Sequence, residues 1–439
     1  MMTLPDTVVS ILAKLESAGF AAYAVGGAIR DLIRGVPPHD WDLTTAATPE
    51  QVIEVFKGET IVPTGLKHGT LTLVIDHIPY EITTFRGEVG YSDHRRPDEV
   101  HFLDSIEADL ARRDFTAGAI AYSPTRGLCD PYGGVQDVQK GILRAVGDPM
   151  TRFEEDGLRI LRALRFASAC GFTIEEKTAQ ALHEGKQLIE PIAVERIYSE
   201  LTRMLCGSGV EQVLLDFGDV IAVAIPELAP LFGYLPPHPD YDRDLWAHTA
   251  ASVASVYSEP VLRWTMLLHD LALPSCLSVP ECRSESYTLH PQMSALLAEN
   301  VFTRLKSDRA TMDAATQLIA RHEAVLPTDR GELHRMAIRL GKQLPIWLLL
   351  VQRADLKAKV LTTDHLRQMR ENISILARLT YVVDFLPLSV RDLAVGGKDL
   401  LELGYRGKEI GEVLERLLIA TTEGLPNTRE DLLAHLATL

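Results

Sequence analysis

The 439-residue sequence lacks the segments and the charge that mark several protein classes. It has no apolar run long enough to span a bilayer, so we expect no membrane partner. Its N-terminus carries Asp6, Lys14 and Glu16 where a signal peptide has a basic start and an unbroken apolar stretch. Its 44 Lys and Arg are outnumbered by 60 Asp and Glu, and the net charge of −16 argues against a general nucleic-acid binder. A local basic site remains compatible with that charge.

The sequence also has few cysteines. The five cysteines are odd in number and form no CxxC pair, which favours a reducing compartment, the cytoplasm. At 46% hydrophobic and 24% charged residues, the composition is that of an ordinary globular protein. The length predicts roughly three domains.

The pattern of apolar residues changes along the chain. Strand-like and helix-like segments alternate over about the first 150 residues, with strands predicted at "AAYAVGG", "DWDLTT", "GTLTLVID" and "IPYEITTF". From there the apolar spacing of three and four predicts helices almost throughout. Proline-rich stretches at 226–239 and 385–389 are the candidate linkers. The sequence thus predicts a small head of strands and helices followed by a long helical body.

Two aspartates, Asp40 and Asp42, stand one residue apart in "HDWDLTT". On a strand both carboxylates would point to one face, where they repel unless a cation lies between them. Mg²⁺ prefers such oxygen ligands and commonly shares its shell with substrate phosphates. The alternative is a strand end that runs into a polar loop, which is the commoner case for an isolated DxD, so the flanking sequence has to decide.

A glycine pair, Gly26 and Gly27, ends the preceding strand-like segment in "VGGAIRD". Glycines allow close approach of the backbone to a ligand, and the helix that follows offers free N–H groups to phosphate. By itself such a pair is usually a turn. Its position 14 residues before Asp40, with Arg30 on the first helical turn, favours a phosphate site beside a metal site, as nucleotidyl transfer requires.

These segments resemble the class II nucleotidyltransferases, the family of bacterial CCA-adding enzymes, their CC-adding and A-adding relatives and bacterial poly(A) polymerases. The similarity continues through "RRDFTAGAIAY", "DPYGGVQDVQKGILRAVGDP" and "EEDGLRILRALRFASACGF", and it covers most of residues 20–205. The resemblance implies an α+β fold, with a polymerase-β-like head that contains a mixed sheet. It also implies tRNA, CTP and ATP as partners and Mg²⁺ as the cofactor of the head.

The resemblance assigns roles to single residues. It makes Asp40 and Asp42 the metal-binding pair, and we expect Glu81 to be the third carboxylate. Arg112, Arg113 and Asp114 match a segment that binds ribose and phosphates in the family. One departure is Gly118, where the family usually has Asn, and it leaves one sugar or backbone contact in doubt.

Asp156 and Arg159 are spaced by three residues in "EEDGLRILRALRF", which we expect to form a helix with both side chains on one face. A carboxylate beside a guanidinium complements the amine and ring nitrogen that cytosine and adenine share, and it mismatches uracil and guanine. A simple helix ion pair is the alternative. In the family the matching pair selects CTP and ATP. Arg162 and Arg165 continue at three-residue steps toward the expected phosphates.

The segment 85–100, "FRGEVGYSDHRRPDEV", reads as a mobile loop, which the family uses as a lever when it switches from C to A addition. Its full length favours an enzyme that adds A. Poly(A) polymerases carry an arginine-rich segment where this chain has "GLKHGTLTL". We therefore expect CCA addition, with A addition alone, a poly(A) polymerase, or a phosphohydrolase with a nucleotide-binding head as alternatives.

The helical body contains a second pattern, H…HD…H…H…D. Its members are His248, His269, Asp270, His290, His322 and Asp355. The pattern resembles the HD superfamily of metal-dependent phosphohydrolases. It implies one metal on His248, His269, Asp270 and Asp355, with His290 and His322 available for a second, although Pro291 replaces the usual acidic residue after His290. Such ligands suit Mn, Ni, Co, Fe or Zn, and the implied activity is that of a phosphatase or 2′,3′-cyclic phosphodiesterase.

The C-terminal segment 394–436 resembles the region of the family that holds the tRNA elbow. Lys398, Arg406 and Lys408 flank glycines there, either as phosphate contacts or as a solvated turn. We therefore predict four parts: a nucleotidyltransferase head (1–147), a helical neck with the base-selecting helix (148–225), an HD-type helical domain (226–384) and a tRNA-binding tail (385–439). The sequence does not indicate an oligomeric state.

Overall fold

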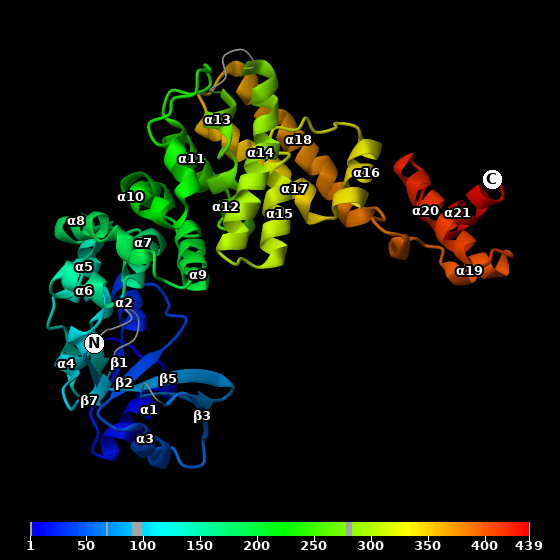
Figure 1. The fold of residues 1–439 in the computed structure, drawn as a ribbon. Coiled ribbons are helices and arrows are strands. Elements are labelled where there is room, and N and C mark those ends of the chain that lie inside the picture. The colour runs from blue at the N-terminus through cyan, green and yellow to red at the C-terminus, as the bar shows by residue number, and fades with distance from the viewer. Residues whose placement is uncertain (1, 67–68, 90–98, 278–282, 439) are drawn as a thin grey trace. The chain divides into compact units, whose positions relative to one another are not determined.

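The computed structural model describes residues 2–66, 69–89, 99–277 and 283–438. The chain divides into two compact units, residues 1–226 and 227–439 (Figure 1). The first contains a mixed sheet and the second is helical, which confirms the predicted fold class. The predicted boundaries after 147 and 384 fall inside these units, so the division into four parts remains a prediction. Most of the expected lever segment, 90–98, and Lys67 and His68 of "GLKHGTLTL" lie outside the described residues.

The first unit is built on a seven-stranded sheet in the order β3-β4-β5-β2-β1-β8-β9. β2 and β5 pair in parallel, whereas the other neighbours in this sheet are antiparallel. Its strands are β1 (Ala22–Val25), β2 (Asp42–Thr45), β3 (Thr60–Gly65), β4 (Thr70–Ile75), β5 (Ile78–Thr84), β8 (Ala121–Ser123) and β9 (Gly127–Cys129). Two small two-stranded sheets are formed by β6 (Arg86–Val89) with β7 (Glu99–Phe102) and by β10 (Ile142–Leu143) with β11 (Thr173–Ile174).

The turn between β4 and β5 shows how local sequence fixes this sheet. Asp76 and His77 have positive φ angles of 49° and 64°, as the two central residues of a tight hairpin turn require. This turn joins the strands predicted at "GTLTLVID" and "IPYEITTF" as an antiparallel hairpin. The turn sets the register of β4 with β5, and β5 pairs along its other side with β2, where Glu81 stands opposite Asp42.

The helices of the first unit follow and interleave the strands. They are α1 (Asp6–Ser17), α2 (Gly27–Arg34), α3 (Pro49–Val55), α4 (Ile106–Ala111), α5 (Gly134–Lys140), α6 (Pro149–Glu155), α7 (Leu158–Cys170), α8 (Glu176–Glu184), α9 (Val194–Leu205) and α10 (Val210–Ala224). α1 buries Val8, Ile11, Leu12 and Leu15, at the predicted helical spacing.

The helix predicted through Asp156 and Arg159 is interrupted, so that prediction is wrong in this detail. α6 ends at Glu155, Asp156 is extended (φ −145°, ψ 104°), and α7 begins at Leu158. Asp156 Oδ1 accepts the N–H of Leu158 at 3.0 Å, as a residue that caps a helix start does. Gly157 fits so tightly that an added Cβ would lie 2.2 Å from the carbonyl oxygen of Leu188. Capping chemistry and this close approach therefore override the helical periodicity.

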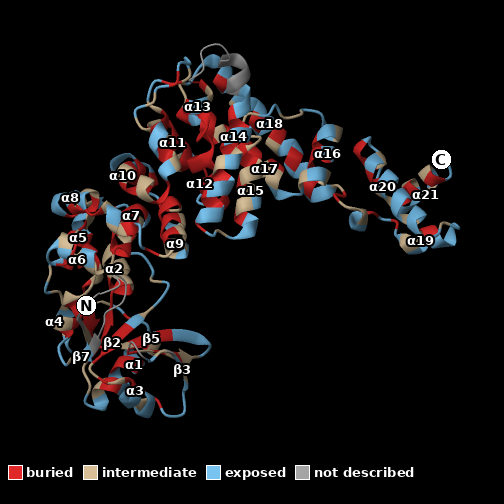
Figure 2. Cartoon of the chain, in the orientation of Figure 1, coloured by how far each residue is buried: buried red, intermediate tan, exposed pale blue. Residues whose placement is uncertain are grey.

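The second unit is a set of helices with a long α18. Its helices are α11 (Leu245–Ser255), α12 (Pro260–Leu268), α13 (Leu273–Leu277), α14 (Arg283–Arg304), α15 (Arg309–Ile319), α16 (Arg330–Leu340), α17 (Gln343–Ala358), α18 (Thr363–Phe385), α19 (Gly397–Glu402), α20 (Lys408–Thr422) and α21 (Arg429–Leu436). Every residue of α12 from Val261 to Leu268 is buried, as Figure 2 shows, so this helix forms the centre of the bundle. None of the helices in the described part of the chain is long and apolar enough to span a membrane.

Candidate active site and candidate metal centre

A pocket of about 490 Å³ opens in the first unit where β1 ends and α2 begins. It brings together most of the nucleotide-site residues expected from sequence. These are Gly26, Gly27, Arg30, Asp40, Asp42, Arg113, Asp114, Arg162 and Arg165. Segments that are more than 100 residues apart in the sequence thus line one cavity.

The glycine pair lies where the backbone approaches this pocket most closely. Gly26 has φ 76° and ψ −129°, a conformation that is almost restricted to glycine. A Cβ at this position would lie 3.2 Å from Arg113 Nη1 and 4.0 Å from Asp42 Oδ2. The absence of a side chain therefore keeps open the space between a guanidinium, a carboxylate and the start of α2.

The carboxylates of Asp40, Asp42 and Glu81 lie close together near the start of β2. Asp42 is the first residue of β2 and pairs in register with Glu81 of β5. Asp40 lines the pocket from the segment before β2. The expectation that both aspartates lie on one strand is therefore wrong. In the described part of the chain, Asp40, Asp42 and Glu81 form no hydrogen bond or ion pair through their side chains.

The electrostatics of this group fit a bound cation. Desolvation and the neighbouring Asp40 raise the pKa of Asp42 above its ordinary value, although Arg113 opposes the shift. Desolvation, Asp42 and Asp40 raise the pKa of Glu81 in the same way. Three carboxyl groups that disfavour one another's charge form an oxygen-rich site, which suits Mg²⁺.

A cluster of arginines faces the carboxylates across the pocket. The Nε of Arg162 donates to Asp114 Oδ2 at 2.8 Å, and its Nη2 donates to the same oxygen at 2.6 Å. Burial raises the pKa of Asp114, but Arg162 and Arg159 outweigh it and hold the pKa below its ordinary value. Asp114 thus stays charged and fixes the direction of Arg162.

Phe166, which the sequence reasoning missed, organises the same cluster. The guanidinium carbons of Arg30, Arg162 and Arg165 lie 5.5, 5.3 and 4.2 Å from the centre of its ring. Cations over an aromatic face are attracted by the ring. Phe166 therefore holds three positive charges together in a pocket that an anion can enter. The sequence did contain a signal for this role, because Phe166 follows Arg165 by one residue and Arg162 by four.

Asp109 is a second residue that was not foreseen. Its fully buried carboxylate accepts hydrogen bonds from Arg112 Nη2 at 2.8 Å and lies 3.5 Å from Arg113 Nη2. Arg112 does not line the pocket, whereas Arg113 does. Asp109, three and four residues earlier on α4, thus sets the positions of both arginines.

The two residues expected to select the base, Asp156 and Arg159, are not paired with each other in this structure. Arg159 pairs with Glu155 and donates to the backbone carbonyls of Arg152 and Arg112, while Asp156 Oδ2 accepts from Arg196 Nη2 at 3.4 Å. The expected pairing on one helix face fails because Asp156 lies before α7. Neither residue lines the pocket.

Gly118 lines the pocket and has an ordinary negative φ. Its carbonyl accepts from Arg113 Nη1 at 3.4 Å, and an added Cβ would meet only Asp114 Oδ1 at 3.7 Å, an ordinary contact. The backbone therefore leaves room for a side chain at this position, and the glycine is not needed for the turn.

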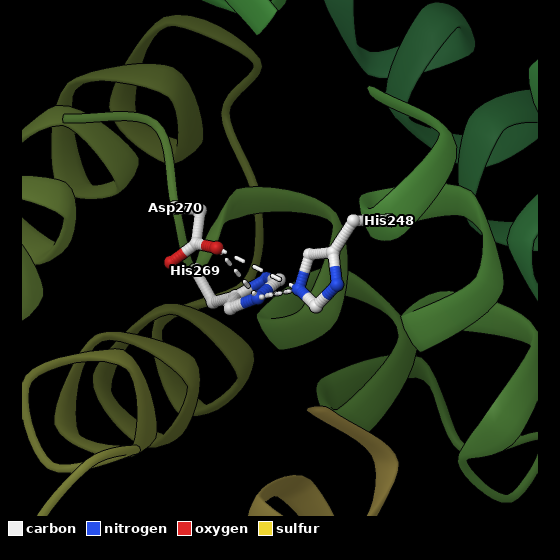
Figure 3. Close-up of side chains that lie close together, drawn as sticks. All are labelled: His248, His269 and Asp270. Atoms are coloured by element: carbon white, nitrogen blue, oxygen red, sulfur yellow. Dashed lines mark hydrogen bonds and ion pairs between the residues drawn. The ribbon is translucent and has the colours of Figure 1, made fainter. Parts of the chain in front are cut away.

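The second unit brings the H…HD…H…H…D residues into one buried cluster. His248 lies on α11, His290 on α14 and Asp355 on α17, while His269 and Asp270 follow α12 and His322 follows α15. Figure 3 shows the rings of His248 and His269 turned toward each other beside the Asp270 carboxylate. The ligand atoms form two triads that share Asp270, namely His248-His269-Asp270 and Asp270-His290-His322, each within 4.8 Å.

Distances within the cluster show how the two triads meet. Asp270 Oδ2 lies 3.2 Å from His269 Nε2, whereas its Oδ1 lies 3.3 Å from His290 Nε2 and 3.6 Å from His322 Nε2. Asp355 Oδ1 lies 3.1 Å from His248 Nε2. The second triad is therefore assembled despite Pro291, which the sequence reasoning treated as an argument against it.

Orphaned polar atoms support a cation at this cluster. Asp270 Oδ2 and Asp355 Oδ1 are buried and accept no hydrogen bond of good geometry from the described residues. Burial lowers the pKa of His269, but Asp270 and Asp355 outweigh it and raise the pKa to about 10. Their own pKa values are lowered well below the ordinary range because the histidines, and Lys359 for Asp355, offset the penalty of burial. Charged carboxylates beside imidazoles are a donor set that suits a divalent transition metal.

The three basic residues of the C-terminal segment have different surroundings. Lys398 on α19 and Lys408 at the start of α20 are exposed. Arg406 Nη1 donates to the carbonyls of Leu401 and Tyr405 at 2.7 and 2.8 Å, so it closes the end of α19.

Comparison with known proteins relates both units to one family. The Poly A polymerase head domain model matches residues 22–144, and the model described as "Probable RNA and SrmB- binding site of polymerase A" matches residues 171–231. A CCA-adding enzyme of Pediococcus pentosaceus is 33% identical over 95% of this chain and 94% of its own length. The chain belongs to the CCA-adding enzyme family.

Further members agree with this family over most of the chain. The CCA-adding enzyme of Enterococcus faecalis is 33% identical over 97% of this chain and 93% of its own length. The crystal structure of the Bacillus stearothermophilus CCA-adding enzyme in complex with CTP has a TM-score of 0.64 at 26% identity, over 98% of this chain and 97% of that one. The Thermotoga maritima CCA-adding enzyme complexed with tRNA shares the fold, with a TM-score of 0.58 at 20% identity. The family resemblance expected from the sequence is thereby confirmed.

Proposed function

We propose that this chain adds C, C and A to the 3′ end of tRNA from CTP and ATP, without a nucleic-acid template. One observation carries the proposal: three carboxylates without hydrogen-bonded partners, Asp40, Asp42 and Glu81, gather at the start of β2 in the described structure, and the two aspartates line the pocket that holds Arg113 and Arg162. Family membership supports the same reaction.

We assign different roles in the reaction to different residues of the pocket. Asp40 and Asp42 would hold Mg²⁺ with the help of Glu81, and the bound metal would polarise the attacking 3′-hydroxyl and steady the pyrophosphate that leaves. Gly26 and Gly27 let the triphosphate approach the backbone, while the arginines held by Phe166 neutralise its charge.

Base selection requires a rearrangement. We assign it to Asp156 and Arg159, whose polar groups now serve Arg196, Glu155 and backbone carbonyls. Both residues must exchange these partners for the Watson–Crick edge of cytosine or adenine. A uracil or guanine would leave them unpaired, which costs about 1–3 kcal/mol for each buried group.

The test uses tRNA transcripts that end before the first C, after the second C, and after the A. The pure protein receives CTP and ATP, singly and together, with Mg²⁺. Incorporation of C on the shortest transcript supports the proposal. Incorporation of A alone on the transcript that ends in CC would favour an A-adding enzyme, and long runs of A on any RNA would favour a poly(A) polymerase.

We further propose that the buried histidine cluster is a phosphohydrolase centre of the HD type, acting as a phosphatase or 2′,3′-cyclic phosphodiesterase. The two triads that share Asp270 favour this second activity. His248, His269, Asp270 and Asp355 would hold one transition metal, with His290 and His322 completing the site for a second. The metal would activate a water molecule.

Asp40→Ala separates the two activities. We expect the variant to lose nucleotide incorporation and to keep phosphate ester hydrolysis, because the two sites lie in different units of the chain. Loss of both would indicate a single shared centre. A protein that hydrolyses phosphate esters and never incorporates nucleotides would be a phosphohydrolase with a nucleotide-binding head.

We assign tRNA contacts to Lys398 and Lys408, which are exposed near glycines, and a supporting role to Arg406. The four described cysteines form no disulfide, which agrees with our placement of the reaction in the cytoplasm.

A further inference from the structure

The helical unit contains a pocket of about 310 Å³ that reaches the histidine cluster. Its lining includes His322 and Asp355, which belong to the cluster, together with Gln352, Lys359 and His365. A pocket of this size is at the lower end of those that take small molecules. It can admit one small phosphate ester.

Lys359 is the unusual group in this pocket. Its side chain is only 7% exposed, and lysine is rarely so buried unless it is paired. Its Nζ lies 2.7 Å from Asp355 Oδ2, while Oδ1 of the same carboxylate faces His248 Nε2 at 3.1 Å. A single carboxylate group thus separates the ammonium from the histidine cluster.

The neighbours of Lys359 fix its position. The ammonium lies 5.7 Å from the centre of the Tyr241 ring, whose edge packs against His248 at 5.0 Å between ring centres. The backbone N–H of Val360 donates to the carbonyl of Asp240 at 2.8 Å, which ties the end of α17 to the segment that carries Tyr241. These contacts hold the ammonium beside Asp355 at the pocket.

Two other lining residues, His365 and Gln352, are also held by polar contacts. The ring nitrogens of His365 contact Val360 O at 2.7 Å and Asp240 Oδ2 at 3.4 Å. Gln352 donates to the carbonyl of Ala324 at 2.7 Å. The pocket is thus a preformed polar cavity in which one ammonium, that of Lys359, lies among the carboxylates of Asp240, Glu323 and Asp355, so an anion can bind there only when metal ions on the cluster offset this negative charge.

We infer that this pocket binds the phosphoryl group of a small phosphate ester, with the ammonium of Lys359 contacting one phosphoryl oxygen while the metals on the histidine cluster bind the others. This inference rests on the proposed HD-type centre and names its substrate class and a further substrate-contacting residue. An anion placed between metal ions and an ammonium is stabilised from both sides, because each cation contributes a favourable charge contact in a partly dry site. Asp355 orients Lys359 through one oxygen, and its other oxygen would be available to a metal on the cluster.

The test measures binding of inorganic phosphate to the full-length protein loaded with Mn²⁺, by calorimetry. Lys359→Met should keep the Mn²⁺ stoichiometry and weaken phosphate binding about tenfold or more, as loss of one charged hydrogen bond of about 1.5–3 kcal/mol implies. Lys357→Met, two residues earlier on α17 and exposed, is the matched control and should bind phosphate as the wild type does.

Gln368 gives a second pair of variants that leaves the buried groups intact, since this residue is exposed and lines the same pocket. Gln368→Glu should weaken phosphate binding and Gln368→Lys should strengthen it, each by a few-fold. Unchanged phosphate affinity in Lys359→Met, or loss of Mn²⁺ along with phosphate, would overturn the inference, because Lys359 would then be a structural partner of Asp355 alone. Phosphate binding without any hydrolysis of phosphate esters would instead remove the proposed hydrolase activity and leave the pocket in place.

Discussion

Replacement of Gly26 by alanine tests the geometry of the nucleotide pocket most directly. The residue has φ 76° and ψ −129°, which L side chains adopt only with strain, and its Cβ would point between Arg113 Nη1 and Asp42 Oδ2. The strain alone costs about 1–3 kcal/mol. In a unit of this size, that corresponds to a loss of roughly 2–10 °C in melting temperature.

The effect on activity should exceed the effect on stability. A methyl group 3.2 Å from Arg113 Nη1 forces the guanidinium to shift by a few tenths of an ångström, away from the position in which we expect it to contact phosphate. Displacement of one charged hydrogen bond in the transition state corresponds to a loss of roughly tenfold to a hundredfold in kcat/KM. The assay is incorporation of CTP on tRNA lacking CCA, at a temperature where the variant remains folded.

Two glycines provide matched controls. Gly407 has φ 58° and ψ −127°, nearly the conformation of Gly26, with no atom within 4 Å of its added Cβ, so Gly407→Ala reports the cost of strain alone on the melting curve. Gly35 ends the same helix α2 with φ 73° and open space around it, so Gly35→Ala should lower stability and leave nucleotide affinity unchanged. The reasoning fails if Gly26→Ala loses stability as Gly407→Ala does yet retains the wild-type kcat/KM.

Four further substitutions probe the two sites. Asp42→Asn should abolish nucleotide incorporation. The pKa of Asp42 is raised in the folded protein, so its charged form lowers stability once the pH has risen above the ordinary value of 3.8 and the raised value. At pH 7 without Mg²⁺ the variant should therefore melt at a higher temperature than the wild type, and a lower melting temperature would contradict this. Asp270→Ala should remove all bound Mn²⁺, measured by elemental analysis, whereas His322→Ala should retain one ion, since only Asp270 belongs to both triads; equal losses would argue against two positions. Phe166→Leu keeps an apolar side chain but removes the ring that contacts three guanidinium groups. The KM for CTP should rise several-fold, while the free energy of unfolding should fall by less than about 1.5 kcal/mol. An unchanged KM would show that the arginines keep their positions without the ring.

Local signals were sufficient for much of the first unit. Alternating and periodic apolar residues located the strands and helices, and Asp76-His77 located the turn of the β4–β5 hairpin. The turn sets the register of β4 with β5, whereas the pairing of β5 with β2 places Glu81 beside Asp42. The family resemblance could be recognised from segments that were continuous in the sequence.

The interrupted helix shows where periodicity misled. The spacing of Asp156 and Arg159 fits a helix, but Asp156 caps α7 and Gly157 packs against a carbonyl from residue 188. That contact comes from a segment about 30 residues away, and no local pattern reveals it. For the same reason the present partners of Arg159 could not be read from the sequence.

The sequence by itself determined the residue types, their order and their local elements: the carboxylates before and on β2, the glycines at the start of α2, and six candidate metal ligands on or next to helices of the body. Only the tertiary structure decided which of them meet. Asp270 became common to two triads, Phe166 the centre of three arginines, and Lys359 the partner of Asp355 beside a cavity. The physical reason is that burial, desolvation and charge pairing depend on distances between segments remote in the chain, and packing of whole helices and strands sets those distances.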